Sequence, residues 1–192
     1  MLPSPTLRSI GPETRATRPR RISVLGATGS IGESTLDLIG RNASDYQVVA
    51  LTGGRNVARL AELAILHRTE LAVIADPRCY APLRAALAGT GIKIAAGEAA
   101  LIEAAGLPAD WVMAAIVGAA GLKPTLEAVR QGTATALANK ECLVSAGTIF
   151  MAEVARAKTT LLPVDSEHSA ASQAMVGARQ ERIERICLTA SG

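Results

Sequence analysis

Short apolar runs and longer segments of helical periodicity alternate along the chain from residue 21 onward. The apolar runs show little polar alternation, which is typical of strands that helices cover on both faces of a parallel sheet. They predict strands at 21–26, 47–52, 71–75, 92–95, 111–117, 134–137, 161–164 and 183–189. The periodic segments predict helices at 31–40, 56–67, 77–88, 98–105, 122–131, 141–157 and 168–179. This repeated order of strand and helix predicts an α/β fold with a doubly wound parallel sheet.

Composition excludes several classes of protein. Of the 192 residues, 49% are apolar and only 2% are aromatic, so alanine and leucine supply most of the core. No apolar stretch reaches the roughly 20 residues of a membrane span. The net charge of +3 comes mainly from arginines before residue 22. Because the rest of the chain is nearly balanced and aromatic residues are scarce, we expect neither a membrane nor a nucleic acid as a partner.

Residues 1–20 contain proline, serine, threonine and arginine without an apolar centre, which excludes a secretory signal peptide. An organelle transit peptide shares this composition, but the segment is short, so we expect a disordered basic tail on a bacterial protein rather than a plastid one. Cys79, Cys142 and Cys187 are odd in number and widely spaced. We interpret them as reduced thiols of a cytoplasmic protein.

The stretch RISVLGATGSIG at residues 21–32 combines a short apolar strand with a glycine-rich turn, and a helical pattern follows it. Strand, G-x-x-G-x-x-G turn and helix in this order are what a dinucleotide-binding crossover needs. Gly26 permits a tight turn, Gly29 lets the backbone approach a pyrophosphate, and Gly32 lets helix and strand pack closely. The N–H groups at the start of the helix would face the phosphates. The alternative is a purely structural turn.

The end of the second predicted strand indicates which dinucleotide is bound. In NAD-selective crossovers an acidic residue about 20 positions past the glycines holds the ribose 2′-hydroxyl. Here the strand runs into Gly53-Gly54-Arg55-Asn56, without an acid. A guanidinium offers the 2′-phosphate of NADP a charge-assisted partner. In the alternative interpretation Arg55 is a solvated loop charge and Asn56 only caps the next helix.

An acidic cluster, PVDSEHS, occupies residues 163–169 between a short strand and a helix. In an extended segment Asp165 and Glu167 would point to the same side, and two carboxylates there suit Mg²⁺ or Mn²⁺. Ser166 and Ser169 could add hydroxyl groups. In the alternative interpretation Asp165 or Ser166 caps the helix, and Glu167 favours its positive end. We expect His168 to be a hydrogen-bonding neighbour rather than a metal ligand.

A second polar tripeptide, Asn139-Lys140-Glu141, follows the predicted strand 134–137. Open α/β sheets place their ligands at the carboxyl ends of strands, where Lys140 could meet a phosphate or an enolate-like oxygen. The alternative is a surface loop with Asn139 as a helix cap. Cys142 comes next, and its place in the helical pattern favours a buried structural thiol over a nucleophile.

Taken together, these segments resemble the 1-deoxy-D-xylulose-5-phosphate reductoisomerase family over residues 22–192. The most specific motifs of this resemblance are PVDSEHSA and ALANKE. The motifs that carry it are GATGSIG (26–32), GGRN (53–56), VGAAGL (117–122), ALANKE (136–141), PVDSEHSA (163–170) and TASG (189–192). Members of this family often have lysine at the position of Arg55, and either cation can serve.

The resemblance implies a Rossmann-like domain that binds NADPH, a divalent metal (Mg²⁺, Mn²⁺ or Co²⁺) and a sugar phosphate substrate. By resemblance the cofactor-binding residues are Thr28, Gly29, Ser30, Ile31, Gly54, Arg55, Asn56, Asn139 and Glu141. The implied substrate contacts are Lys140, Ser166, Glu167 and Ser191, with Lys140 and Glu167 as catalytic residues. Asp165 and Glu167 are the implied metal ligands.

The resemblance also implies how the chain is divided. Residues 1–20 would be the tail, 21–160 the NADP-binding domain, and 161–192 the beginning of an α+β catalytic domain. Family members are about twice as long, so we expect the chain to be a fragment that is inactive alone, and a homodimer when full length. Two other functions fit parts of the sequence. One is another NADP-dependent reductase of the semialdehyde dehydrogenase type, which needs a thiol nucleophile. The other is a cofactor-binding module without catalysis.

Overall fold

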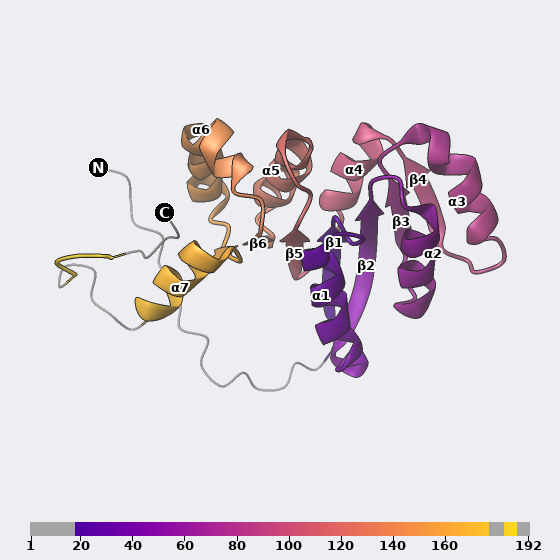
Figure 1. Ribbon diagram of the computed structural model, residues 1–192, viewed down its shortest axis with the longest axis horizontal. Coiled ribbons are helices and arrows are strands. Elements are labelled where there is room, and N and C mark those ends of the chain that lie inside the picture. The colour runs from indigo at the N-terminus through magenta and orange to yellow at the C-terminus, as the bar shows by residue number, and fades with distance from the viewer. Residues whose placement is uncertain (1–17, 177–182, 188–192) are drawn as a thin grey trace.

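In the part of the chain that the structure describes, seven parallel strands form one sheet in the order β4-β3-β2-β1-β5-β6-β7 (Figure 1). The structure is a computed structural model, and it describes residues 18–176 and 183–187. The strands are β1 (Arg20–Leu25), β2 (Tyr46–Gly53), β3 (Leu71–Ile74), β4 (Lys93–Ala96), β5 (Trp111–Ala114), β6 (Ala134–Leu137) and β7 (Leu161–Pro163). The predicted doubly wound parallel sheet is therefore confirmed.

The helices cover both faces of the sheet. They are α1 (Ser30–Gly40), α2 (Val57–Leu66), α3 (Tyr80–Ala86), α4 (Glu98–Ala105), α5 (Leu122–Arg130), α6 (Glu141–Ala157) and α7 (Ser166–Ala174). Side chains of α1, α2 and α3 share one core cluster with β1 and β2, whereas α4 packs against the other face. Helices α4, α5 and α6 follow one another in contact along that second face.

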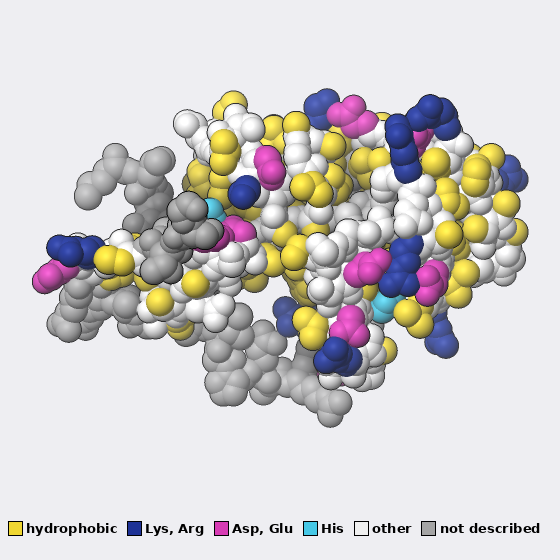
Figure 2. All heavy atoms as spheres, viewed as in Figure 1, with side chains coloured by type: hydrophobic (Ala, Val, Ile, Leu, Met, Phe, Trp, Pro, Cys, Tyr) yellow, Lys and Arg dark blue, Asp and Glu magenta, His cyan; other side chains and the backbone are white. Residues whose placement is uncertain are grey.

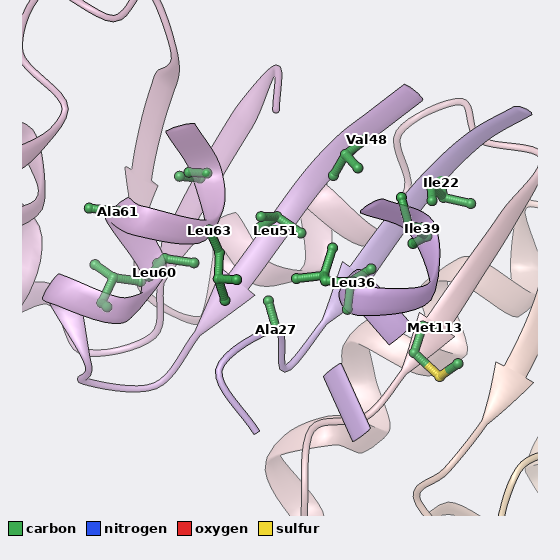
Figure 3. Packing of buried hydrophobic residues seen from close by; sticks show 14 of the residues in the cluster. Ile22, Ala27, Leu36, Ile39, Val48, Leu51, Leu60, Ala61, Leu63 and Met113 are labelled. Carbon is green, nitrogen blue, oxygen red and sulfur yellow. The ribbon is translucent and has the colours of Figure 1, made fainter. Parts of the chain in front are cut away.

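The main core lies between the sheet and the pair α1 and α2 (Figure 3). Leu36 and Ile39 of α1, and Leu60 and Leu63 of α2, point toward the strands and are almost fully buried. Their spacings of three are those that place side chains on one helix face. The strand side chains beneath them are also apolar, as Figure 3 shows for Leu51. These helices are therefore fixed against β1 and β2 by burial.

Strand β1 lies at the centre of the sheet and pairs with β2 on one side and β5 on the other. The chain moves outward from β1 to β4 in one direction and then, with β5, crosses to the other side. This reversal creates a topological switch point, and open α/β sheets bind ligands in the crevice outside the strand carboxyl ends there. The turns after β1, β2 and β5 are thus the segments that a ligand would meet.

The predicted helix 77–88 is divided in the structure. A 3₁₀ turn spans Pro77–Cys79, and α3 begins only at Tyr80. The Asp76 side chain caps this turn, since it accepts a hydrogen bond from the Arg78 backbone N–H at 3.0 Å. Pro82 explains the division, because a helix begun at Pro77 would need a backbone N–H at that position. Beginning at Tyr80 places Pro82 in the first turn, where the N–H has no intrahelical partner.

Two predicted strands differ in extent. The strand predicted at 111–117 ends at Ala114, and Val117 is 81% exposed. Residues 183–187 carry no regular structure, so the strand predicted at 183–189 is wrong over those residues, while 188 and 189 lie outside the described ones. The last predicted helix, 168–179, instead begins at Ser166 and ends at Ala174.

The first described residues belong to the folded structure. Arg18 forms a two-pronged ion pair with Asp110, with N···O distances of 2.7 and 2.9 Å, and β1 already begins at Arg20. The rest of the predicted tail, residues 1–17, lies outside the described residues. Within the described part, no helix has the length and apolarity needed to cross a bilayer.

Candidate functional site

The glycine-rich turn between β1 and α1 is built as the sequence predicts. Gly26 has a positive φ of 86°, and a Cβ there would collide with the Ala115 carbonyl at the end of β5. A Cβ on Gly32 would overlap the Gly26 carbonyl oxygen and the Ala27 backbone. The first and third glycines therefore permit the tight turn and the close approach of α1. Gly29 precedes α1 and is exposed, but it meets no such close contact.

The start of α1 presents its amide groups toward the strand ends. Gly29 is the N-cap and supplies no side-chain cap, so the N–H groups of Ser30 and Ile31 have no side-chain partner from that position. All three residues are exposed, whereas Thr28 is half-buried. An uncapped, exposed helix start of this kind attracts anionic groups such as phosphates. The donor set thus fits the pyrophosphate of a dinucleotide.

Thr52 at the end of β2 anchors this turn. Its hydroxyl oxygen accepts a hydrogen bond from the Gly26 N–H at 2.9 Å, and its carbonyl accepts one from the Ala27 N–H at 2.7 Å. Thr52 is fully buried, so these bonds are shielded from water. Thr52 is not recognisable from the sequence, because nothing local shows that a residue 26 positions away from Gly26 binds the turn.

The second turn, Gly53 to Asn56, lies beside the first. Asn56 caps α2 by accepting a hydrogen bond from the Arg59 N–H at 3.1 Å, which confirms the predicted cap. Arg55 is 75% exposed, and its Nε lies 2.9 Å from Oδ2 of Asp76 at the end of β3. The cap leaves the Arg55 guanidinium outside the helix. Binding of an NADP 2′-phosphate by Arg55 remains a prediction.

Asp76 brings a carboxylate to this turn, which the sequence analysis did not anticipate. Arg78 donates two hydrogen bonds to this carboxylate, from Nε to Oδ1 at 3.0 Å and from Nη2 to Oδ2 at 2.7 Å. This hydrogen bonding, together with the Arg78 backbone N–H and the charge of Arg55, holds the pKa of Asp76 far below its usual range. The carboxylate is therefore ionised and paired with two guanidinium groups, and the local charge is positive.

Asn139 is buried at the end of β6 and holds in place the segment that follows β5. Its amide nitrogen donates to the carbonyls of Ile116 and Gly118, and its Oδ1 accepts from the Cys142 N–H. A Cβ on Gly121 would collide with the same amide, so Gly121 makes room for it. Asn139 therefore bonds to the first turn of α6, but the N-cap of that helix is Lys140, and Asn139 is buried instead of lying in a surface loop. Contact between Asn139 and a cofactor remains a prediction.

The next two residues take different positions. Lys140 is exposed just before α6, and Glu141 is half-buried in its first turn. β6 pairs with β7, with Leu137 beside Pro163, so the structure brings the end of β6 near the start of α7. Figure 2 shows basic, acidic and histidine side chains together where α6 and α7 meet. Residues from two predicted motifs, ALANKE and PVDSEHSA, therefore lie in one polar region.

The acidic cluster begins a helix instead of forming an extended segment, so that part of the prediction is wrong. Asp165 is the N-cap of α7, since Oδ1 accepts the His168 N–H at 2.9 Å and Oδ2 lies 2.7 Å from His168 Nδ1. Partial burial raises the pKa of Asp165, but these bonds outweigh it, and the net pKa lies below the ordinary value. The Ser166 hydroxyl donates to Glu167 at 2.6 Å and lowers the pKa of that carboxyl.

Both carboxylates are therefore ionised and outside the core, and their oxygens are the donors that Mg²⁺ prefers. Among the described residues, no group of three or more histidine, cysteine, aspartate or glutamate side chains could hold a metal. Asp165 and Glu167 could thus supply two oxygen ligands of an ion that keeps waters or takes substrate oxygens. Ser191 lies outside the described residues. The expected ligand roles remain predictions.

Cys142 is the thiol that the semialdehyde dehydrogenase alternative would use. It is fully buried against Phe150 and Val154, and burial raises the pKa of the thiol. A nucleophilic cysteine needs exposure and a depressed pKa. The expectation of a buried structural thiol is confirmed.

The parallel sheet, its switch point and the glycine turn define a dinucleotide-binding protein of the Rossmann-like class. The profile of the family described as 1-deoxy-D-xylulose 5-phosphate reductoisomerase matches residues 22–147, and that of its C-terminal domain matches residues 161–192. The chain therefore belongs to the 1-deoxy-D-xylulose 5-phosphate reductoisomerase family.

Similar proteins carry the same name. The chain is 58% identical to the 1-deoxy-D-xylulose 5-phosphate reductoisomerase of Jannaschia sp. over 173 residues, which are 90% of this chain and 44% of the relative. The Zymomonas mobilis enzyme in complex with NADPH has 59% identity and a TM-score of 0.78, over 80% of this chain and 40% of that one. A DOX-P reductoisomerase in complex with NADPH, fosmidomycin and magnesium has 42% identity and a TM-score of 0.75, over 78% and 37%. The chain thus spans less than half of each.

Proposed function

We propose that this chain carries the NADPH-binding part of a 1-deoxy-D-xylulose 5-phosphate reductoisomerase. The complete enzyme would rearrange 1-deoxy-D-xylulose 5-phosphate and reduce the product with NADPH to 2-C-methyl-D-erythritol 4-phosphate, a step of non-mevalonate isoprenoid synthesis. Residues 21–160 would hold the cofactor, and residues 161–192 would begin the catalytic domain. The match of the second profile to residues 161–192 supports this division. We expect a cytoplasmic bacterial enzyme that is a homodimer when full length.

The observation that carries the proposal is the pair of adjacent turns at the switch point. The α1 start offers exposed amides to a pyrophosphate, and the turn after β2 offers Arg55 to a 2′-phosphate. Hydrogen bonds from Gly26 and Ala27 to Thr52 hold the two turns together. A dinucleotide could then lie across both turns, with its adenosine end toward Arg55. Solved relatives in complex with NADPH support this placement.

The polar region around α7 is our proposed substrate and metal site. A divalent metal bound there would act as a Lewis acid on the vicinal oxygens of the substrate. Asp165 and Glu167 would hold the metal, and Lys140 would neutralise a substrate oxygen or phosphate. The Ser166 hydroxyl orients Glu167, and His168 fixes Asp165. These residues would keep the substrate in register with the cofactor across the ends of β6 and β7.

A titration of the purified chain with NADPH and with NADH, followed by the cofactor fluorescence, tests the proposal. We expect NADPH to bind at least about tenfold more tightly, because a charge-assisted contact to the 2′-phosphate contributes on that scale. Arg55→Asp should reverse the preference by removing a phosphate partner and adding repulsion. Arg41→Asp, at the far end of α1, makes the same charge change away from the site and should leave both affinities unchanged. Equal affinity of the unaltered chain for the two cofactors would refute the proposal.

A further inference from the structure

The loops after β2 and β3 bring two arginines onto one carboxylate. Arg55 Nε and Arg78 Nη2 contact the same oxygen, Oδ2 of Asp76, at 2.9 and 2.7 Å. Asp76 is 10% exposed, whereas the two arginine side chains are 75% and 77% exposed. Figure 2 shows basic side chains gathered over these loops, at the upper right of the view. The carboxylate thus lies beneath a pair of accessible guanidinium groups.

The backbone fixes the two loops beside each other. The Asp76 N–H donates to the Gly54 carbonyl at 3.2 Å, and the Cys79 thiol lies 3.9 Å from the Arg55 carbonyl. The Asp76 side chain also accepts the Arg78 backbone N–H, which holds the 3₁₀ turn in place. Arg78 therefore stands next to the Gly54–Asn56 turn because the end of β3 is hydrogen-bonded to it.

The charge of this arrangement is unbalanced. Two guanidinium groups repel each other, and one carboxylate compensates only one of them, so an excess positive charge remains at an exposed surface. Arg78 uses Nε and one Nη to grip Asp76, and Arg55 uses its Nε. Each guanidinium has further N–H donors, because arginine carries five. A doubly charged phosphate could accept those donors and relieve the repulsion.

We propose that Arg78 is a second binding residue for the 2′-phosphate of NADPH, acting with Arg55, and that Asp76 positions both guanidinium groups. The inference rests on the proposed NADPH-binding function and deepens it by adding a specificity-determining residue from a different strand end. It also explains why an acidic residue next to the 2′-phosphate position does not select NAD. Asp76 is occupied by two arginines and is not available to a ribose hydroxyl.

The test measures the affinities of Arg78→Ala for NADPH and NADH by fluorescence titration. We expect NADPH binding to weaken by about tenfold, as the loss of a charge-assisted phosphate contact does, with NADH binding unchanged. Arg78→Lys should lie between, because lysine keeps the charge but cannot grip Asp76 with two bonds. Arg84→Ala, which removes an exposed arginine from the last turn of α3, is the matched control and should change neither affinity.

The outcomes separate the inference from the function on which it rests. A selective loss of NADPH affinity in Arg78→Ala supports the inference. If Arg55→Ala loses NADPH selectivity while Arg78→Ala binds both cofactors like Arg84→Ala, the inference is wrong and the proposed function stands. If Arg78→Ala weakens NADPH and NADH equally, its role is structural and the inference is overturned. If the unaltered chain shows no preference for NADPH, both are refuted.

Discussion

At the scale of single residues, the glycine turn requires residues without a Cβ atom. Gly32 lies inside α1, where a glycine normally weakens a helix relative to alanine. Here a Cβ would overlap the Gly26 carbonyl and the Ala27 backbone, so the missing side chain is what lets α1 approach the turn. The steric requirement therefore outweighs helix propensity at this position.

Gly32→Ala should destabilise the fold by about 2 kcal/mol, since backbone must shift to admit the methyl group. Gly40→Ala, at the end of the same helix, is the control. A Cβ on Gly40 meets only the His67 ring at an ordinary 3.6 Å, so its free energy of unfolding should change little or rise slightly. Urea unfolding followed by circular dichroism measures both. Equal effects of the two substitutions would contradict the steric account.

Asp165 combines a confirmed role with a predicted one. As a cap it can be replaced by asparagine at small cost, because both residue types cap well. As a metal ligand it cannot, because the charge is lost. Asp165→Asn should therefore leave the helicity of α7 nearly unchanged but weaken Mn²⁺ binding several-fold, measured by electron paramagnetic resonance. Glu103→Gln, at an exposed position of α4, is the charge-matched control. Unchanged Mn²⁺ binding in Asp165→Asn would leave only the cap.

At the scale of elements, Asp110 holds the start of β1 through an ion pair with Arg18 and a hydrogen bond with Arg21, an arrangement we call the Asp110 clasp. The Asp110 side chain accepts a hydrogen bond from the Arg21 backbone N–H at 2.7 Å. It also pairs with both terminal nitrogens, Nη1 and Nη2, of Arg18. The hydrogen bond from Arg18 is the largest cause that lowers the pKa of Asp110, and burial opposes it. A carboxyl whose pKa is lower in the folded than in the unfolded chain stabilises the fold at a pH above its unfolded pKa, which is 3.8 for Asp110. This stabilisation is lost as the pH falls through the pKa of the folded chain.

The clasp predicts how stability depends on pH. Asp110→Asn should lower the free energy of unfolding at pH 7 by about 1 kcal/mol or less, because the pair is partly exposed. The difference between the variant and the unaltered chain should shrink as the pH falls below about 4, since Asp110 has a lowered pKa in the folded chain. Asp37→Asn, in the exposed pair with Arg41, should have a smaller effect at pH 7. Urea midpoints across this range provide the check, and a difference that stays constant down to pH 2 would contradict the clasp.

The pattern of apolar positions predicted nearly every element, because burial of one helix face or both strand faces is recorded locally in the sequence. The pattern failed where contacts between residues far apart in the sequence determine the local structure. β5 ends early because the Asn139 side chain binds the carbonyls of Ile116 and Gly118, which draws them out of the strand ladder. Residues 183–187 form no strand, and Glu184 and Arg185 interrupt the apolar positions there.

At the scale of the whole molecule, the site is assembled from turns that are far apart in sequence. The glycine turn was predictable because its spacing and flanking elements are local. The contacts of Thr52 and Arg78 were not predictable, because they depend on strand order, which places the ends of β1, β2 and β3 side by side. The acidic cluster does lie between a short strand and a helix, but its predicted extended conformation is wrong, since Asp165 caps a helix that begins at Ser166.

The described residues contain two carboxylates at the proposed metal site and no third side-chain ligand among histidine, cysteine, aspartate and glutamate. The chain also spans less than half of its relatives. We therefore expect the 192-residue chain to bind NADPH but to oxidise it negligibly with 1-deoxy-D-xylulose 5-phosphate and Mg²⁺, measured by absorbance at the nicotinamide band. Omission of Mg²⁺ is the control and should change nothing. Robust, Mg²⁺-dependent oxidation would show that the two carboxylates suffice.

Hydrogen–deuterium exchange of the chain with and without NADPH tests the central claim most directly, because it locates the cofactor on the backbone. The account predicts protection of residues 26–32 and 52–56, with weaker protection of 76–79. It predicts unchanged exchange at 106–110, which lie at the amino ends of the central strands, opposite the end that carries the glycine turn. Protection confined to 106–110, or no protection at the glycine turn under saturating NADPH, would contradict it.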